Sequence, residues 1–172
     1  MSIAGWQDGL YDALLEAGVK QVAYVPDSGH KQLIERCHEN AALSTTVLTT
    51  EEEGIALLAG AWLGGDKGVL LLQSSGVGNC INMLSLPVEC RIPLLMLVTM
   101  RGEWGEFNPW QVAMGQGTPA ALEAMGVLVY RADEPGQVVE TVRHCAALAF
   151  NSGRSVAVLL GQRVIGAKVF RK

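Results

Sequence analysis

The sequence predicts an α/β domain in three layers, with a doubly wound, mainly parallel six-stranded sheet between two layers of helices. Short apolar runs alternate six times with helical stretches along the chain, which is typical of parallel strands joined by helices. The runs are apolar throughout rather than at every second residue, as expected of strands covered on both faces. The chain has 172 residues, of which 49% are hydrophobic and 17% charged. It therefore suits one folded domain, which we expect over residues 1–172.

The strands are predicted where aliphatic and β-branched residues cluster, in order at 21–25, 44–48, 68–73, 93–99, 127–132 and 156–160. The helices are predicted at 5–17, 30–39, 51–63, 78–89, 119–125 and 135–150. The last helix shows the 3.6-residue repeat well, with apolar residues at Val138, Val142, Cys145, Ala146 and Ala149.

The charge balance and the cysteines exclude several classes of protein. There are 13 Lys and Arg against 17 Asp and Glu, a net charge of −4, which gives no broad attraction for nucleic acid or for anionic membranes. No apolar run reaches the roughly 18 residues of a membrane span, and the N-terminal segment does not resemble a signal peptide. Cys37, Cys80, Cys90 and Cys145 have no metal-binding spacing. We expect free thiols, no metal ligands in this chain, and a soluble cytoplasmic protein.

Ligands of parallel sheets bind where the strands end, so the segment after each strand is informative. The first is Pro-Asp-Ser-Gly-His, residues 26–30, which offers Asp27, Ser28 and His30. Ser28 and Lys31 match the S-x-x-K of a serine acyl-transfer site, but the other elements of that site are absent. Asp27 and Ser28 are also common helix N-caps, and a lone histidine is commonly structural.

The segment after the second strand begins a helix. Thr50 and Glu53 have the capping-box spacing, which gives Glu52 and Glu53 an ordinary structural role. Glu51 differs because it heads an apolar stripe formed by Ile55, Leu58, Ala59 and Trp62. We expect its carboxyl to be partly shielded from water. Apolar surroundings favour the neutral acid and the helix N-terminus favours the carboxylate, and the sequence leaves that balance open.

The segment after the third strand is Ser-Ser-Gly-Val-Gly-Asn, residues 74–79. Gly76 and Gly78 would let a ligand approach the backbone, although a tight turn explains them equally well. A dinucleotide-binding fingerprint needs a third glycine where Ile81 stands, and no Walker pattern occurs. A nucleotide-binding protein of the flavodoxin type is therefore the weaker interpretation.

The segment after the fourth strand, residues 100–119, is long and rich in functional side chains. It contains Arg101, Glu103, Trp104, Glu106, Phe107, Asn108, Trp110 and Gln111. Loops of this length are usually functional or interfacial, and the aromatic residues favour a protein interface or a substrate wall. A self-packed loop is the structural alternative.

Taken together, these motifs resemble the pyrimidine-binding (PYR) domain of thiamine-diphosphate-dependent decarboxylases, above all the sulfopyruvate and phosphonopyruvate decarboxylase group. The resemblance extends over roughly residues 10–165 and rests on four motifs. They are Val25-Pro26-Asp27-Ser28, the helix start Glu51-Glu52-Glu53-Gly54 with Ala56 to Trp62, the segment Ser74 to Asn79, and Arg101-Gly102-Glu103.

The resemblance implies roles for individual residues. Glu51 would hydrogen-bond N1′ of the cofactor aminopyrimidine and so promote formation of the C2 ylide, which attacks a 2-oxo acid. It implies that the cofactor is contacted by Glu51, Ser75, Gly76, Gly78 and Asn79. The catalytic candidates are Glu51, Ser28 and His30, and the substrate candidates are Asp27, Ser28, Arg101 and Gln111.

The resemblance also implies that the chain carries half of a site. The G-D-G…N motif that holds Mg²⁺ and the diphosphate in this family is missing here. We expect a separate β subunit with that pyrophosphate-binding (PP) domain, in an α₂β₂ or larger assembly. The helix 51–63 and the aromatic residues 104–110 would lie at its interface. A carboligase or other lyase subunit, and a non-catalytic α/β binding module, remain alternatives.

Overall fold

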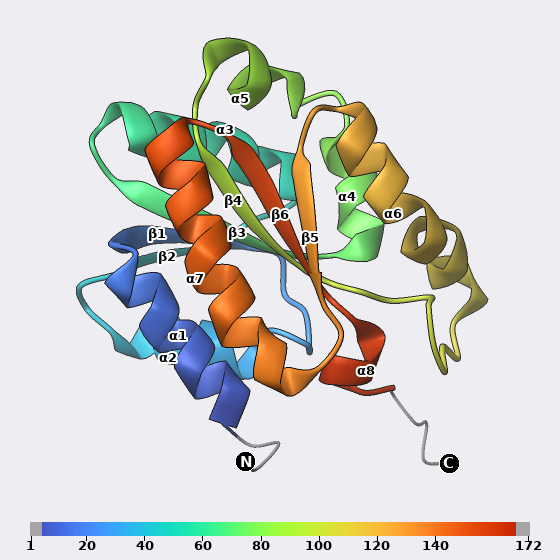
Figure 1. Cartoon of the computed structure of the whole chain (residues 1–172). Helices are drawn as coiled ribbons and strands as arrows, with labels where there is room; N and C mark the ends of the chain where they lie inside the picture. The colour runs from blue at the N-terminus through green and yellow to red at the C-terminus, as the bar shows by residue number, and fades with distance from the viewer. Residues whose placement is uncertain (1–4, 168–172) are drawn as a thin grey trace.

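The computed structural model describes residues 5–167 and confirms the predicted fold class. Six strands form one parallel sheet in the order β2-β1-β3-β4-β6-β5 (Figure 1). The strands are β1 (Val19–Tyr24), β2 (Ser44–Val47), β3 (Lys67–Gln73), β4 (Leu94–Thr99), β5 (Leu128–Ala132) and β6 (Ser155–Leu160). The helices are α1 (Trp6–Glu16), α2 (Lys31–Glu39), α3 (Glu51–Leu63), α4 (Ser74–Cys80), α5 (Ser85–Cys90), α6 (Val112–Ala124), α7 (Pro135–Ser152) and α8 (Gln162–Ile165), with a 3₁₀ turn at Pro109–Gln111.

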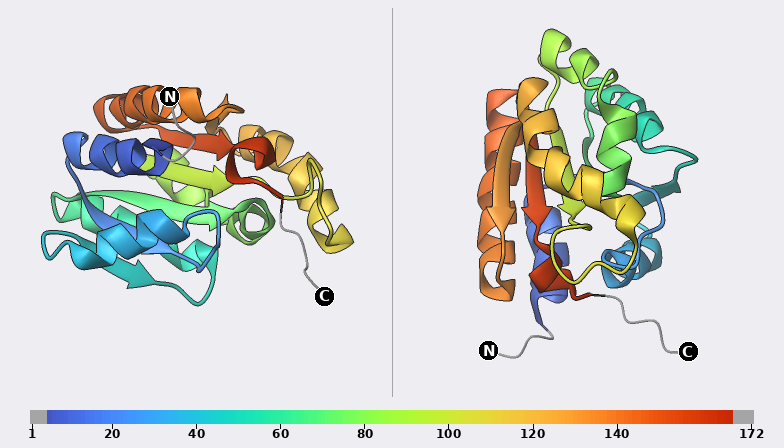
Figure 2. Two further views of the ribbon diagram at one scale, coloured as in Figure 1. Left: turned by 90° about the horizontal axis from the view of Figure 1, so that it is seen from below. Right: turned by 90° about the vertical axis from the view of Figure 1, so that its right-hand side faces the viewer.

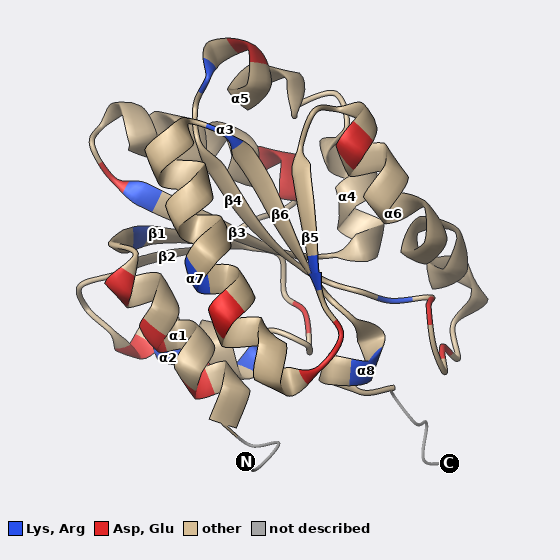
Figure 3. Ribbon diagram, in the orientation of Figure 1, with Lys and Arg blue, Asp and Glu red and all other residues tan. Residues whose placement is uncertain are grey.

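Helices cover both faces of the sheet and create two hydrophobic cores (Figure 2). One core joins the sheet to α1, α2 and α7, and the other joins it to α3, α4 and α6. Every residue of β4 and β6 is buried, which explains their uninterrupted apolar sequences. The two edge strands, β2 and β5, have mostly exposed or half-buried residues. Neither β4 nor β6 carries a charge, and the charged residues lie on helices, on loops and on strands β1, β3 and β5 (Figure 3).

The strand order changes direction next to β1, whose neighbours are β2 and β3. The chain runs outward from β1 to β2 and then returns to the other side of β1 to form β3. Such a switch point opens a crevice at the carboxyl ends of the strands, and ligands of this architecture bind there. The segments that follow β1, β2, β3 and β4 all begin at this edge.

Two predicted helices differ from the observed ones. The helix predicted at 78–89 is two helices: α4 begins directly after β3, and α5 follows a turn at 81–84. The segment 74–79 is therefore the first part of a helix, not a loop. Its serines and glycines favour a loop by propensity, but burial of Val77 and Cys80 in the core outweighs this preference.

The helix predicted at 119–125 begins at Val112, so the connection after β4 is shorter than predicted. Gly115 and Pro119 give this segment a low intrinsic helix propensity. Gly115 instead lets α6 lie against the backbone of Arg101 and Gly102, where a Cβ atom would be 1.9 Å from the Arg101 carbonyl oxygen. The short helix α8 was not predicted. Within residues 5–167, no helix has the length and apolar character needed to cross a membrane.

Candidate active site

Glu51 is the first residue of α3, and local sequence fixes its direction. Thr50 and Glu53 form the predicted capping box: the Thr50 side chain accepts from the Glu53 N–H, and Glu53 Oε2 accepts from the Thr50 N–H. Thr49 N–H also donates to Glu53 Oε2, at 2.8 Å. The cap therefore uses Glu53 and leaves Glu51 free for another role. The Glu51 residue is 6% exposed, which confirms the predicted shielding from water.

The neighbouring helix α4 surrounds the Glu51 carboxyl. Asn79 donates through Nδ2 to Glu51 Oε2 at 2.8 Å. Gly76 lies against the same carboxyl, and a Cβ atom on Gly76 would be 2.2 Å from Oε1. Gly76 thus makes room for Glu51. Cys80, one turn further along α4, is affected too: burial, together with the nearby charges of Glu51 and Glu52, raises the pKa of its thiol to about 12.

A second group of polar side chains gathers around Asp27 in the segment after β1. Asp27 Oδ2 accepts from Thr99 Oγ1 at 2.7 Å and from the Gly29 N–H at 2.9 Å. Asp27 Oδ1 accepts from Arg101 Nη2 at 3.0 Å. Burial by itself raises the pKa of this carboxyl, but the Thr99 hydrogen bond, the nearby His30 ring and the Arg101 guanidinium together outweigh it and leave the pKa below its usual value. Asp27 is therefore an anion at neutral pH.

Arg101 is held inside this group rather than extended into solvent. Its side chain is 7% exposed and that of Asp27 is 5% exposed, so the ion pair is buried. The same Nη2 atom donates to Ser28 Oγ at 3.0 Å. Because Asp27 neutralises the guanidinium, Arg101 acts here as a hydrogen-bond donor that positions the segment after β1.

A pocket of about 200 Å³ opens beside this group. It is lined by Pro26, Asp27, Ser28, Gln73, Arg101, Glu106, Phe107, Asn108 and Gln111. Gln111 Oε1 is buried there without a hydrogen-bond partner among the described residues. A buried carbonyl oxygen that lacks a donor is costly, so a ligand with a suitable N–H or O–H group would be favoured in this pocket.

Ser74 links the surroundings of Glu51 to those of Asp27. As the first residue of α4, it accepts from the Arg101 N–H through Oγ at 3.0 Å. Thr118 of α6 donates to the Ser74 carbonyl oxygen at 3.2 Å. The start of α4 and the start of the segment after β4 are therefore fixed to each other, and both groups lie at the carboxyl edge of the sheet.

Residues 101–111, which we call the aromatic loop, are held by a buried glutamine. Gln162 of α8 accepts from the N–H groups of Glu103 and Trp104, each at 2.9 Å, and donates to Glu106 Oε2 at 2.9 Å. Burial raises the pKa of Glu106, but hydrogen bonds from Asn108 N–H, Gly102 N–H and Gln162 outweigh it and lower the pKa. The loop is thus self-packed, as in the structural alternative.

The same loop nevertheless exposes large apolar side chains. Trp104 and Phe107 are each 46% exposed and Trp110 is 84% exposed. The Arg163 guanidinium lies 4.8 Å from the centre of the Trp104 ring. Glu103 turns away from the pocket and pairs with Arg131. An ordered loop that exposes aromatic rings is typical of a protein interface.

His30 does not line the pocket. Its residue is 1% exposed, and Nε2 lies 3.0 Å from the Leu97 carbonyl oxygen in the middle of β4. Burial lowers the pKa of the ring, against the opposing effect of Asp27. The ring holds the segment after β1 onto the sheet, and this position does not support the predicted catalytic role of His30.

Comparison with known proteins identifies the family of this chain. Residues 6–106 match the model for the thiamine pyrophosphate enzymes, N-terminal TPP binding domain. The chain belongs to this family. The matched segment contains Glu51, Asn79, Asp27 and Arg101, and it extends from α1 into the aromatic loop.

Individual relatives similar in sequence are decarboxylases by name, and a solved structure shares the fold. The chain is 34% identical to sulfopyruvate decarboxylase subunit alpha of Methanococcus maripaludis, over 89% of this chain and 92% of the relative. It is 40% identical to phosphonopyruvate decarboxylase of Streptomyces viridochromogenes, over 66% of this chain but 29% of that protein. A solved structure of a putative thiamin diphosphate-dependent enzyme from Mycobacterium smegmatis superposes with a TM-score of 0.72 at 18% identity, covering 97% of this chain and 33% of that one.

The structure brings most of the predicted residues of this family member into two adjoining groups. Glu51, Gly76 and Asn79 form one, with Ser75 half-buried and Gly78 exposed on the same helix. Asp27, Ser28, Arg101 and Gln111 form the other around the pocket. Three residues that hold these groups together were not predicted from the sequence: Ser74, Thr99 and Gln162. Thr99 ends β4 and Gln162 follows β6, so the same rule about strand ends would have found both.

Proposed function

We propose that this chain is the pyrimidine-binding subunit of a thiamine-diphosphate-dependent 2-oxo acid decarboxylase. The proposed activity is that of the relatives named sulfopyruvate decarboxylase subunit alpha, whose length the match almost fully covers. The observation that carries the proposal is the buried carboxyl of Glu51 at the start of α3, in a chain of this family. A carboxyl shielded from water at the start of a helix can keep a hydrogen bond to a bound ring without competition from solvent.

The residues around Glu51 fit an aminopyrimidine ring. Asn79 donates to Oε2, so Oε1 is the carboxyl oxygen that remains for a hydrogen bond with the cofactor ring. On α4, Gly76 is buried against the carboxyl, whereas Gly78 and Asn79 further along the helix are exposed. The exposed part of α4 is where the ring would approach in this proposal. We assign the contacts to the cofactor ring to Glu51, Ser75, Gly76, Gly78 and Asn79.

Thiamine diphosphate, when bound, would supply a carbon acid whose deprotonated form can add to a 2-oxo acid and whose ring can accept the electron pair released with carbon dioxide. The contribution of Glu51 is a hydrogen bond to ring nitrogen N1′, which increases the basicity of the 4′-amino group. Shielding from water keeps this hydrogen bond from being replaced by solvent. Asn79 fixes the orientation of the carboxyl and so has a positioning role.

We assign the substrate to the pocket beside Asp27. Its charged side chains are Asp27, Glu106 and Arg101, which sum to −1. Ser28 and Gln111 can offer hydrogen bonds to the keto acid, but the pocket has no excess cation to attract an anionic substrate. A sulfonate or phosphonate group on the substrate would then be bound by cations from the partner. Ser28 is the catalytic candidate that remains at the pocket surface.

The partner in this proposal is a β subunit with a pyrophosphate-binding domain. The present sequence lacks the G-D-G…N motif, so Mg²⁺ and the diphosphate are assigned to that subunit. In residues 5–167 no cluster of three or more His, Cys, Asp or Glu side chains could hold a metal ion. The exposed Trp110 and Phe107, with Leu63 at the end of α3 (79% exposed), supply apolar surface for the contact.

The test is reconstitution. We expect no decarboxylation of sulfopyruvate or phosphonopyruvate by the purified chain alone, and release of carbon dioxide when it is mixed with thiamine diphosphate, Mg²⁺ and a β subunit that carries the pyrophosphate-binding domain. A stable complex that binds the cofactor but decarboxylates no 2-oxo acid would overturn the proposal. A carboligase would use the same Glu51, and analysis of the products of the mixture distinguishes it from a decarboxylase.

A further inference from the structure

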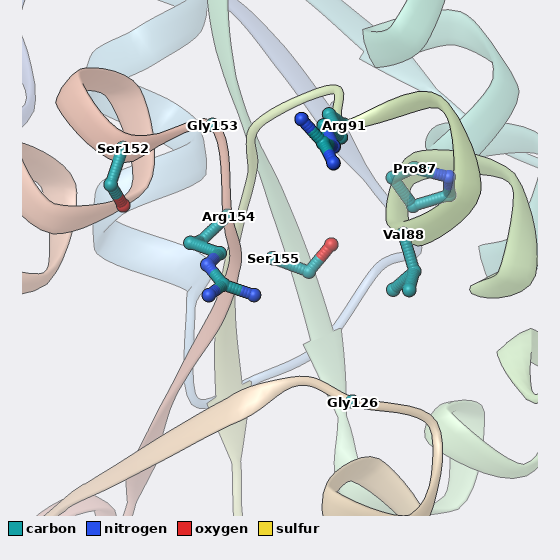
Figure 4. Close-up of a pocket in the computed structure, with 8 residues that line it drawn as sticks. All are labelled: Pro87, Val88, Arg91, Gly126, Ser152, Gly153, Arg154 and Ser155. Carbon is teal, nitrogen blue, oxygen red and sulfur yellow. The ribbon is translucent and has the colours of Figure 1, made fainter.

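Among residues 5–167, two arginines without a charge partner lie together at the opposite edge of the sheet from Glu51 and Asp27. A pocket of about 400 Å³ opens where β4 and β6 begin. It is lined by Pro87, Val88, Arg91, Gly126, Ser152, Gly153, Arg154 and Ser155 (Figure 4). Two of these residues are arginines and none is acidic. The volume is within the range of about 300–1,000 Å³ that small-molecule sites occupy.

The two arginines have no protein partner for their charge. No hydrogen bond, ion pair or ring contact joins the side chain of Arg91 or Arg154 to any residue in the range 5–167. By contrast, a carboxylate holds Arg101 in the aromatic loop and another holds Arg131 in β5. Glu89, close to Arg91 in sequence, forms no ion pair with it. The pocket therefore has two free guanidinium groups.

Ser155 provides an independent observation. The residue is 4% exposed, and its Oγ is buried without a hydrogen-bond partner among the described residues. Figure 4 shows this hydroxyl pointing into the pocket toward Arg91, with the side chain of Arg154 beside it. An unpaired buried hydroxyl is unfavourable, and an anion between the arginines would satisfy it.

Neutralisation of helix dipoles does not explain the arginines fully. Helices α5, α6 and α7 end at this pocket, and each C-terminus carries about half a negative charge. Their last carbonyl groups, however, already accept backbone N–H groups: Pro87 and Val88 from Arg91, Leu122 from Met125, and Ala149 from Gly153 and Arg154. The three helix ends together contribute about −1.5 against the +2 of the two guanidinium groups, so the pocket keeps a positive excess.

We propose that this pocket is a binding site for a phosphorylated small molecule. The phosphate lies between Arg91 and Arg154 and accepts a hydrogen bond from Ser155 Oγ, and the remaining volume holds the rest of the ligand. Guanidinium groups match the geometry of phosphate oxygens and form charge-assisted hydrogen bonds with them. The inference does not depend on the proposed decarboxylase activity, since none of these residues takes part in it.

The experiment titrates the full chain with inorganic phosphate and, separately, with ADP, at constant ionic strength set by sodium chloride. Binding is measured by calorimetry and by the shift in melting temperature. That shift increases with the ratio of the ligand concentration to its dissociation constant. We expect saturable binding of at least one probe. Tighter binding of ADP than of phosphate assigns a nucleotide, and equal binding assigns the phosphate group alone.

Variants separate this site from general charge effects. Arg91→Gln and Arg154→Gln should each weaken binding roughly tenfold or more. Arg143→Gln removes the same charge from an exposed arginine that pairs with Glu16, and it should bind like the parent chain. Ser155→Ala should weaken binding several-fold without loss of stability, because its hydroxyl has no partner to lose. The proposal would be overturned if neither probe bound saturably. It would also be overturned if the double variant Arg91→Gln, Arg154→Gln bound the probes as tightly as the parent chain.

Discussion

Two glycines of α4 provide a matched pair of substitutions with opposite expected effects. A Cβ atom at Gly76 would be 2.2 Å from Oε1, 2.3 Å from Cδ and 2.6 Å from Cγ of Glu51. A Cβ atom at Gly78 would be 3.5 Å from the Met114 sulfur, an ordinary contact with a flexible side chain. Both positions are helical, so replacing either glycine by alanine gains about 0.5–1 kcal/mol of helix stability.

The difference between the two variants reports on the packing of Glu51. In Gly76→Ala the carboxyl must swing away and lose the hydrogen bond from Asn79, at a cost of roughly 1.5–3 kcal/mol for a bond to a charged group. Gly76→Ala should therefore be less stable than Gly78→Ala by about that amount, because the helix contribution cancels. Urea denaturation of both variants and the parent chain measures the difference in the free energy of unfolding.

A double-mutant cycle identifies the cause. In a Glu51→Ala background no carboxyl opposes the new methyl group, so Gly76→Ala should there stabilise the protein by about 0.5–1 kcal/mol, as Gly78→Ala does. If Gly76→Ala were equally destabilising with and without Glu51, or as stable as Gly78→Ala in the parent chain, the contact between Gly76 and Glu51 would be wrong.

Three further outcomes are expected from the second group of residues and from the aromatic loop. Arg101→Met leaves the buried Asp27 carboxylate without its cation and should cost about 3–5 kcal/mol in urea denaturation; a loss below 1 kcal/mol would place the pair in solvent. Because burial lowers the pKa of His30 in the folded state, the unfolded chain takes up a proton first as pH falls below about 6.5, and stability should fall by up to about 1.4 kcal/mol per pH unit. His30→Gln should remove this slope and the exposed His144→Gln should keep it, whereas identical slopes in both variants would contradict the burial. Gln162→Ala releases three hydrogen bonds to the aromatic loop and should speed limited proteolysis there; an unchanged cleavage rate would show that other contacts hold the loop.

The sequence predicts the sheet well because the strands are determined by burial. β4 and β6 are covered on both faces, so their sequences are apolar throughout and their positions are plain. The start of α3 is equally clear, since the capping box of Thr50 and Glu53 is a local interaction.

The helices whose predicted bounds were wrong contain glycines that the structure uses for close packing. Gly76 accommodates a carboxyl and Gly115 accommodates the backbone of Arg101, and both partners are distant in sequence. Propensity alone interprets such glycines as breaks. The pairing of Arg101 with Asp27 is likewise a contact between residues distant in sequence. The sequence therefore predicts both as site residues but does not show that they neutralise each other.

The most direct test of the account concerns proton exchange at the cofactor. In the reconstituted complex, Glu51→Gln should retain thiamine diphosphate but slow hydrogen–deuterium exchange at C2, measured by NMR after acid quenching, by roughly 10²–10⁴-fold, the range for loss of a positioned acid or base. The exposed neighbour variant Glu52→Gln, with the same change in charge, should exchange at the parent rate. Parent-like exchange in Glu51→Gln would contradict the assignment of Glu51 as the group that activates the cofactor.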